Sequence, residues 1–193
     1  MKKVNINNFI CLFHSVLDTT LEVNNPEQKR INIKALESRY IKELAVLAKE
    51  IWTEHYTPII GREQVDYMIG KFQSVPAIKE QLEQLVKYDL VWNQAELIGY
   101  MSYYNKKDHM FLSKFYLHKD FRGKGIGKLM MDYLIEKAKI SASKSIQLTV
   151  NKFNSISINQ YLRMGFKNIG PVVIDIGNGY IMDDYRLEFQ ITD

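Results

Sequence analysis

The chain has 193 residues, which is enough for one domain with a sizeable core. Hydrophobic residues make up 46% of it and charged residues 25%, so the composition is that of a folded, soluble protein and excludes a disordered chain. The formal charge of +4 suits an anionic small-molecule ligand but is too weak to indicate a nucleic acid partner. No run approaches the ~20 apolar residues that a membrane span requires, so no membrane partner is expected.

We predict an N-terminal extension over residues 1–28 and a single domain over 29–193. Lys2 and Lys3, followed by the apolar run 9–17, loosely resemble a signal peptide, but His14 breaks the run and no small-x-small cleavage site follows. The single cysteine, Cys11, excludes an internal disulfide and favours a reducing, cytoplasmic location.

The first half of the domain is predicted to contain one strand and then three helices. Alternating apolar residues predict the strand over 31–36. Apolar residues at a 3.6-residue period predict two helices, with buried stripes formed by Ile41, Leu44, Ala45, Ala48, Ile51 and Trp52, and by Val65, Met68, Ile69 and Phe72. A third helix is predicted over 76–86, with Pro76 at its start.

The second half is predicted to be mostly strands. Aromatic and branched residues within 88–118, with polar breaks at 93–94 and 105–108, predict three antiparallel strands. A helix from Ile126 to Ala138, a strand over 145–150 and a helix over 154–164 follow. Two last strands, over 166–174 and 179–189, are predicted to join in a tight turn at 177–179. The order of elements indicates an α+β domain on a mixed sheet.

Three glycines, Gly123, Gly125 and Gly127, stand between a predicted strand and a predicted helix. Such a turn directs backbone N–H groups and the helix dipole at one point and typically binds phosphate. The spacing does not fit a dinucleotide fingerprint, because the third glycine comes one residue early and no carboxylate stands near 143–147. It does not fit a Walker loop either, because Arg122 occupies the first glycine position and Leu129 replaces the hydroxyl.

The remaining pattern, Arg122-x-x-Gly125-x-Gly127, resembles the Q/R-x-x-G-x-G/A motif of the GNAT (Gcn5-related) N-acetyltransferases. The stretch "FYLHKDFRGKGIG" is similar to that family's strand-to-loop signature, and "LTVNKFNSISINQYLRMGF" resembles its next strand, asparagine-bearing turn and closing Tyr-x-x-x-Gly-Phe. The resemblance covers residues 31–189. It implies a mixed, mostly antiparallel sheet that is flanked by helices and splayed between its central strands, with acetyl-CoA as cosubstrate and no metal.

The resemblance also implies a set of site residues. The CoA-binding residues would be Phe115, Tyr116, Leu117, Arg122, Gly123, Lys124, Gly125, Ile126, Gly127, Lys128, Asn154 and Tyr161. The backbone N–H of Leu117 would stabilise the oxyanion and the phenol of Tyr161 would protonate the leaving sulfur. The alternatives are that Lys128 is a solvated surface lysine and that Tyr161 is a packed core residue; Asn154 would also cap its helix.

The general base is left unassigned, because the predicted strand 109–117 contains no Asp or Glu. The candidates are Glu54, His55, Glu63, Asp183 and Asp184.

The C-terminal stretch "DIGNGYIMDDYRLEF" resembles bacterial polyamine (spermidine) N-acetyltransferases, and "EIWTEHYTPIIG" fits the same subgroup. The expected substrate-binding residues are Glu54, Tyr56, Asp183 and Tyr185, and an acidic mouth could include Glu50, Glu54, Glu63 and Asp66. Strand alternation places Asp183 and Tyr185 on one face and Asp184 and Arg186 on the other, where the last two could form a surface ion pair.

The resulting hypothesis is an enzyme that transfers acetyl from acetyl-CoA to a primary amine of a small molecule, with a polyamine-like acceptor favoured. A protein or peptide N-acetyltransferase and a noncatalytic acyl-CoA-binding module are the alternatives. The aromatic-rich C-terminal strands could also mediate a homodimer.

Overall fold

The computed structural model describes residues 30–192, and in this range seven strands form one sheet in the order β1-β2-β3-β4-β5-β7-β6. The strands are β1 (Ile31–Ala35), β2 (Lys87–Asn93), β3 (Glu96–Asn105), β4 (His109–Leu117), β5 (Ser145–Asn151), β6 (Lys167–Gly177) and β7 (Tyr180–Gln190). Only the β4–β5 pair in this sheet is parallel. The predicted mixed, mostly antiparallel sheet is therefore confirmed, while the predicted extension 1–28, with Cys11, lies outside the described residues.

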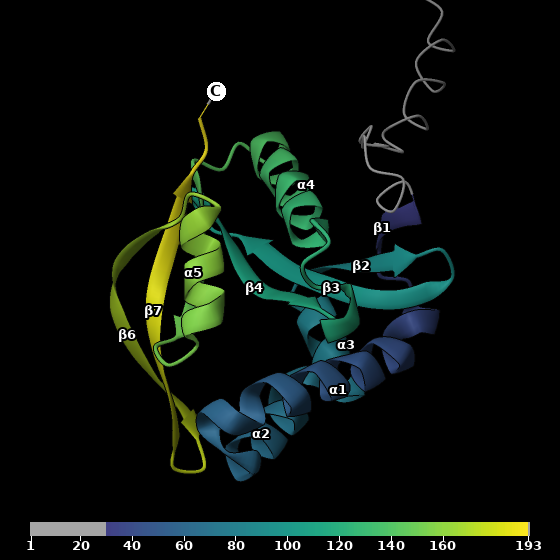
Figure 1. Cartoon of the computed structure of the whole chain (residues 1–193), viewed down its shortest axis with the longest axis vertical. Helices are drawn as coiled ribbons and strands as arrows, with labels where there is room; N and C mark the ends of the chain where they lie inside the picture. Colours follow the sequence, from purple (N-terminus) through teal and green to yellow (C-terminus); the bar gives the residue numbers. More distant parts are fainter. Residues whose placement is uncertain (1–29, 193) are drawn as a thin grey trace, which may run out of the picture.

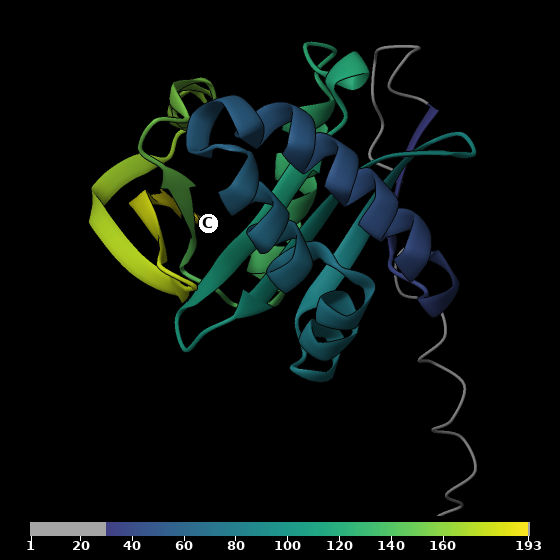
Figure 2. The ribbon, with the colours of Figure 1, turned by 90° about the horizontal axis from the view of Figure 1, so that it is seen from below.

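Helices cover both faces of the sheet (Figures 1 and 2). One face carries α1 (Ile41–Ile60), α2 (Arg62–Met68), the π-helical turn η3 (Ile69–Gln73) and α3 (Val75–Glu83), and the other carries α4 (Ile126–Ile140) and α5 (Ser155–Arg163). Two short 3-10 turns, η2 (Ser38–Tyr40) and η4 (Lys119–Phe121), precede α1 and the glycine turn. None of the helices within residues 30–192 is long and apolar enough to cross a membrane.

Each face has its own core. Leu44 and Ile78 of α1 and α3 pack on Leu90 and Tyr100 of the sheet, and all four are fully buried. Met130 and Leu134 of α4 pack on Ile146 and Leu187 of β5 and β7, also fully buried. A fully buried side chain of this size contributes about 1.5–3 kcal/mol, so the two cores fix the helices on the sheet.

The predicted helices differ from the structure at their ends, and the third, predicted over 76–86, ends at Glu83. The first continues past Trp52 to Ile60 and contains Pro58 in its last turns. The second changes at Ile69 into a π-helical turn, and Ser74 then starts α3 by accepting a hydrogen bond from Ala77 N. Both changes bring side chains of α1 and η3 over the gap described next.

The centre of the sheet is splayed. β4 pairs with β5 at three positions only, from His109 with Ser145 to Phe111 with Gln147, and the two strands then diverge. On its other edge β4 stays close to β3: a Cβ on Gly99 would lie 2.7 Å from the carbonyl oxygen of Tyr116. The divergence exposes one backbone edge of β4 at the level where the glycine turn begins.

Candidate active site

The glycine turn between β4 and α4 has backbone angles that favour glycine. Gly123 has φ of 77° and Gly125, the N-cap of α4, has φ of 80°. This left-handed region costs other residues about 1–2 kcal/mol. The first N–H groups of α4, around Ile126 and Gly127, have no partner inside the helix and lie at the positive end of its dipole. The turn is therefore built to receive an anion, and the residues present fit a pyrophosphate.

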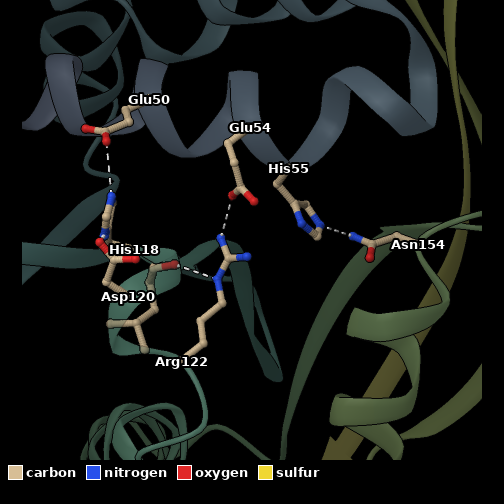
Figure 3. Close-up of polar contacts among 8 residues, drawn as sticks. Glu50, Glu54, His55, His118, Asp120, Arg122 and Asn154 are labelled. Atoms are coloured by element: carbon tan, nitrogen blue, oxygen red, sulfur yellow. Dashed lines mark hydrogen bonds and ion pairs between the residues drawn. The ribbon is translucent and has the colours of Figure 1, made fainter.

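Arg122 lies between the glycine turn and the end of β4. Its Nε donates a hydrogen bond to the Leu117 carbonyl at 3.0 Å, and its guanidinium forms a 3.3 Å ion pair with Glu54 of α1 (Figure 3). The side chain is thus held at the mouth of the gap between β4 and β5.

The two lysines of the turn differ. Lys124 Nζ lies 5.4 Å from the centroid of the Phe121 ring, beside the turn. Lys128 Nζ forms a 2.6 Å ion pair with Asp132, and its side chain is 76% exposed. The position of Lys128 favours the alternative of a surface lysine.

The backbone at the end of β4 points into the gap. His118 N donates to the Ile98 carbonyl at 2.8 Å, so the preceding pair, Leu117 with Gly99, turns its N–H and C=O groups away from β3. Leu117 and, by the same alternation, Phe115 therefore direct backbone groups towards β5, which has already diverged. These are the groups that the sequence predicted for the pantetheine arm.

Tyr161 approaches the gap from α5. Its ring centroid lies 6.1 Å from that of Phe115 and 5.4 Å from that of Phe166, so the ring is packed as the alternative expected. Its hydroxyl makes no side-chain hydrogen bond within residues 30–192. Burial raises the pKa of this phenol well above its usual range, so it stays protonated at neutral pH and can act as a donor.

Asn154 has two polar contacts at the start of α5. Its Oδ1 accepts a hydrogen bond from Ser157 N at 3.2 Å, which confirms the predicted cap. Its Nδ2 lies 3.0 Å from His55 Nε2 of α1 (Figure 3). Burial, and secondarily the charge of Arg122, lower the pKa of His55, so the neutral ring can accept this hydrogen bond. Asn154 and His55 thus link α1 to α5 across the gap.

A groove of about 920 Å³ lies on the α1–α3 face of the sheet. It runs from the gap along β4, β5 and β7, under α1, α2 and α3, and its lining includes Trp52, Tyr56, Lys114, Tyr116, Thr149 and Asp184. The hydroxyls of Tyr56 and Tyr116 lie 3.4 Å apart, and burial raises the pKa of both phenols. Two neutral phenols therefore lie where the groove meets the gap.

Asp184 is the carboxylate at this end of the groove. It pairs with Asn151 of β5, is only 5% exposed, and is close enough to Tyr56 to raise the pKa of that phenol further. Burial raises the pKa of Asp184 to about 6, with Asp183 adding to the shift. A carboxylate with this pKa is mostly ionised at pH 7 and can still accept a proton, as a general base must.

The other predicted acceptor residues do not all meet here. Asp183 is ion-paired with Lys152, and Tyr185 packs against the α4–α5 core, so the face of β7 that lines the groove carries Asp184 and Arg186 instead. Of the predicted substrate-binding residues, Tyr56 lies in the groove and Glu54 lies on the Arg122 side.

The carboxylates expected at an acidic mouth mostly face basic partners. Glu50 pairs with His118 at 3.1 Å and Asp66 with Arg62 at 2.7 Å, while Glu63 is exposed near the start of α2. Within residues 30–192 no three His, Cys, Asp or Glu side chains are grouped to hold a metal ion.

Lys114 is the lining residue that the sequence did not indicate. The register between β3 and β4 shifts at Ser102–Tyr103, where Ser113 and Lys114 form a bulge that turns Lys114 into the groove. Simple alternation gave no signal for this, because a bulge changes the face that a residue occupies.

Residues 45–166 match the model of the acetyltransferase (GNAT) family, and the chain belongs to that family. It is therefore an acetyl-CoA-dependent N-acetyltransferase, as the motifs predicted.

Among the relatives, a probable spermine N(1)-acetyltransferase of Bacillus subtilis subsp. natto (strain BEST195) is 30% identical over 140 residues, which are 67% of this chain and 92% of that protein. The spermine/spermidine N(1)-acetyltransferase of Bacillus subtilis (strain 168) is 29% identical over the same share of each chain. The PaiA N-acetyltransferase from Thermoplasma acidophilum, solved in complex with coenzyme A, superposes with a TM-score of 0.71 at 21% identity, over 83% of this chain and 98% of that one. At 21% identity, the similarity to the Thermoplasma structure shows a shared fold only.

Proposed function

We propose that this chain transfers the acetyl group of acetyl-CoA to the primary amine of a small molecule by direct attack in a ternary complex. One observation carries the proposal: an anion-binding glycine turn on one face of the sheet and a groove with a buried carboxylate on the other both open onto the gap between β4 and β5. Two ligands that enter from opposite faces can therefore meet in the plane of the sheet.

The glycine turn and β4 would hold the cosubstrate. The amides from Gly123 to Gly127 would bind the pyrophosphate, with Arg122 as a charged partner that exchanges Glu54 for a phosphate. The backbone groups of Phe115 and the N–H of Leu117, which β5 does not pair, would bind the pantetheine arm. Acetyl-CoA supplies an activated thioester carbonyl, and the Leu117 N–H would stabilise the negative charge that develops on its oxygen.

Asp184 would serve as the general base. An alkylamine of pKa ~10.4 is protonated at neutral pH, and reaching the neutral form costs about 5 kcal/mol. Asp184 is positioned at the groove end of the gap, and its raised pKa, about 6, matches a base that works near neutrality. His55, another candidate from the sequence, is less suited, because its Nε2 faces Asn154 Nδ2 at 3.0 Å and burial lowers its pKa.

Tyr161 would protonate the departing sulfur. A thiol of pKa ~8.5 is a fair leaving group, so the acid contributes less than the base. Solvent in the gap would return the proton that Tyr161 gives to the sulfur. On the groove side, the phenols of Tyr56 and Tyr116 would orient the amine.

The acceptor is the part that needs testing. The two Bacillus relatives are named for spermine and spermidine, so these polyamines belong in the set of acceptors to be tested. We would measure CoA release by the purified protein with polyamines, amino acids, aminoglycosides and peptides. Release with at least one small amine is expected, whereas release with peptides alone would replace this proposal with a peptide acetyltransferase. Binding of CoA without release for any acceptor would indicate a noncatalytic module.

A further inference from the structure

The groove carries more cationic than anionic side chains. Its lining contains four cationic side chains and two carboxylates, which are Lys71, Lys106, Lys114 and Arg186 against Glu80 and Asp184. A further titratable residue of the lining, His109, is held by Asp108 at 2.9 Å. Glu50 and Glu54 of α1 do not change this balance, because neither lines the groove. A polycation would therefore meet net repulsion in this groove.

The charged side chains of the groove lie at two depths along the strands. Asp184 and Tyr116 lie at the end of the groove next to the gap. Arg186 and Lys114 each stand two residues deeper along the same strands, β7 and β4, and line the same groove. Two residues of a strand span ~7 Å, so a short chain can reach from the carboxylate level to the cation level.

Neither cation of the deeper level has a carboxylate partner within residues 30–192. Lys114 is 5% exposed, and its Nζ donates to Gln81 Oε1 at 2.6 Å and lies 5.1 Å from the Tyr88 ring centroid. Arg186 is exposed to the groove and forms none of the ion pairs in this part of the chain. Burial without a counter-charge lowers the pKa of Lys114 to about 7. A buried cation is costly until an anion pairs with it, so Lys114 favours an anionic group at this depth, and the exposed Arg186 adds a second positive charge there.

We infer that the acceptor is a primary amine with an anionic group, a carboxylate or a phosphate, a short chain away from the nitrogen. The amine would lie against Asp184, and the anion would lie two residues deeper, where Arg186 lines the β7 side of the groove and Lys114 the β4 side. The inference rests on the proposed acetyl transfer and names the substrate class of that same groove.

A matched set of acceptors tests the charge of the far end. δ-Aminovalerate, pentylamine and cadaverine present the same five-carbon chain with an anionic, a neutral and a cationic end, and aminopentyl phosphate distinguishes phosphate from carboxylate. We expect kcat/KM to be roughly ten- to a hundredfold higher for one of the two anionic amines than for pentylamine, the range of a hydrogen bond to a charged group, and lowest for cadaverine.

Two variants assign the effect to residues. Lys114→Met keeps an apolar stem of similar size, and Arg186→Gln keeps polarity without charge. Each is expected to lower the ratio of δ-aminovalerate to pentylamine kcat/KM by about tenfold. Lys42→Gln, at an exposed lysine in the first turn of α1, is the control and should leave the ratio unchanged. An unchanged ratio in both groove variants would overturn the assignment.

The outcomes for the wild type separate this inference from the function it rests on. Equal rates with the three carbon chains, or fastest release with cadaverine, would overturn the anionic acceptor and leave acetyl transfer standing. If no amine releases CoA from a protein that still binds it by calorimetry, the proposed function fails and this inference fails with it.

Discussion

Asp184→Asn is expected to make the protein more stable and less active. The pKa of Asp184 is raised by burial from 3.8 to about 6, a shift of roughly two units and about 3 kcal/mol. Because the folded pKa is the higher one, the folded state binds more protons between about pH 4 and 6, and stability falls as pH rises through that window. Asparagine cannot ionise, so the variant should recover most of this destabilisation, about 2 kcal/mol of unfolding free energy at pH 8. That gain raises Tm by roughly 4–8 °C.

The same variant should lose the base. A positioned general base contributes about 10²–10⁴ in rate, so we expect kcat/KM for the amine to fall about 10²-fold while the Kd for CoA stays within twofold. In the wild type, the slope of log kcat/KM against pH should decrease by one unit as pH rises through about 6, the pKa of Asp184. The variant should lack this break, although the titration of the amine itself remains.

Asp183→Asn is the matched control, because Asp183 is ion-paired with Lys152 on the opposite face of β7. It should keep wild-type turnover to within about threefold, and it should not become more stable. Turnover of Asp184→Asn close to that of the wild type would refute the base assignment. A lower Tm for Asp184→Asn at pH 8 would refute the argument from burial, and loss of activity in Asp183→Asn alone would restore the acceptor role that the sequence suggested.

Three further substitutions test the proposed acid, the glycine turn and the packing of β3 against β4. Tyr161→Phe should lower kcat by about 10²-fold or more with CoA affinity unchanged, because it removes the acid and keeps the ring contacts with Phe115. Gly125→Ala forces alanine to φ of 80°, so stability should fall by about 1 kcal/mol and calorimetry should show at least tenfold weaker CoA binding. Gly99→Ala places a Cβ 2.7 Å from the Tyr116 carbonyl oxygen and should cost about 1–3 kcal/mol in denaturant unfolding. Gly70→Ala, with nothing within 4 Å, is its control and should be nearly neutral.

Local features of the site could be predicted from the sequence. The glycine turn depends on backbone angles that Gly123 and Gly125 adopt readily, and its position before an amphipathic stretch identifies a helix N-terminus. The cap formed by Asn154 is local for the same reason, since it bonds to a residue three positions later. Side chains within one turn decide these features, so no distant contact had to be known.

Features that depend on distant elements could not be predicted. Alternation correctly separated Asp183 from Asp184, but which of the two faces the groove depends on where α1 and α2 cross the sheet. The bulge at Ser113 and Lys114 changes the face of a residue without a clear sequence signal. Glu54 was expected to bind an acceptor, but it pairs with Arg122, 68 positions away. The sequence gives no signal for such a tertiary contact.

The side chains at the end of β4 explain why the reaction is expected in the plane of the sheet. Phe115 and Leu117 direct their side chains into the α4–α5 core, and Tyr116 directs its ring into the groove on the other face. The N–H groups of such a strand lie between these two faces, in the sheet plane. A thioester bound to the Leu117 N–H would therefore have its carbonyl carbon between the two layers of helices, where an amine in the groove can reach it. The divergence of β5 after Gln147 lets the cosubstrate and the amine approach from opposite faces of the sheet. If β4 were fully paired, these N–H groups would form hydrogen bonds with β5 instead.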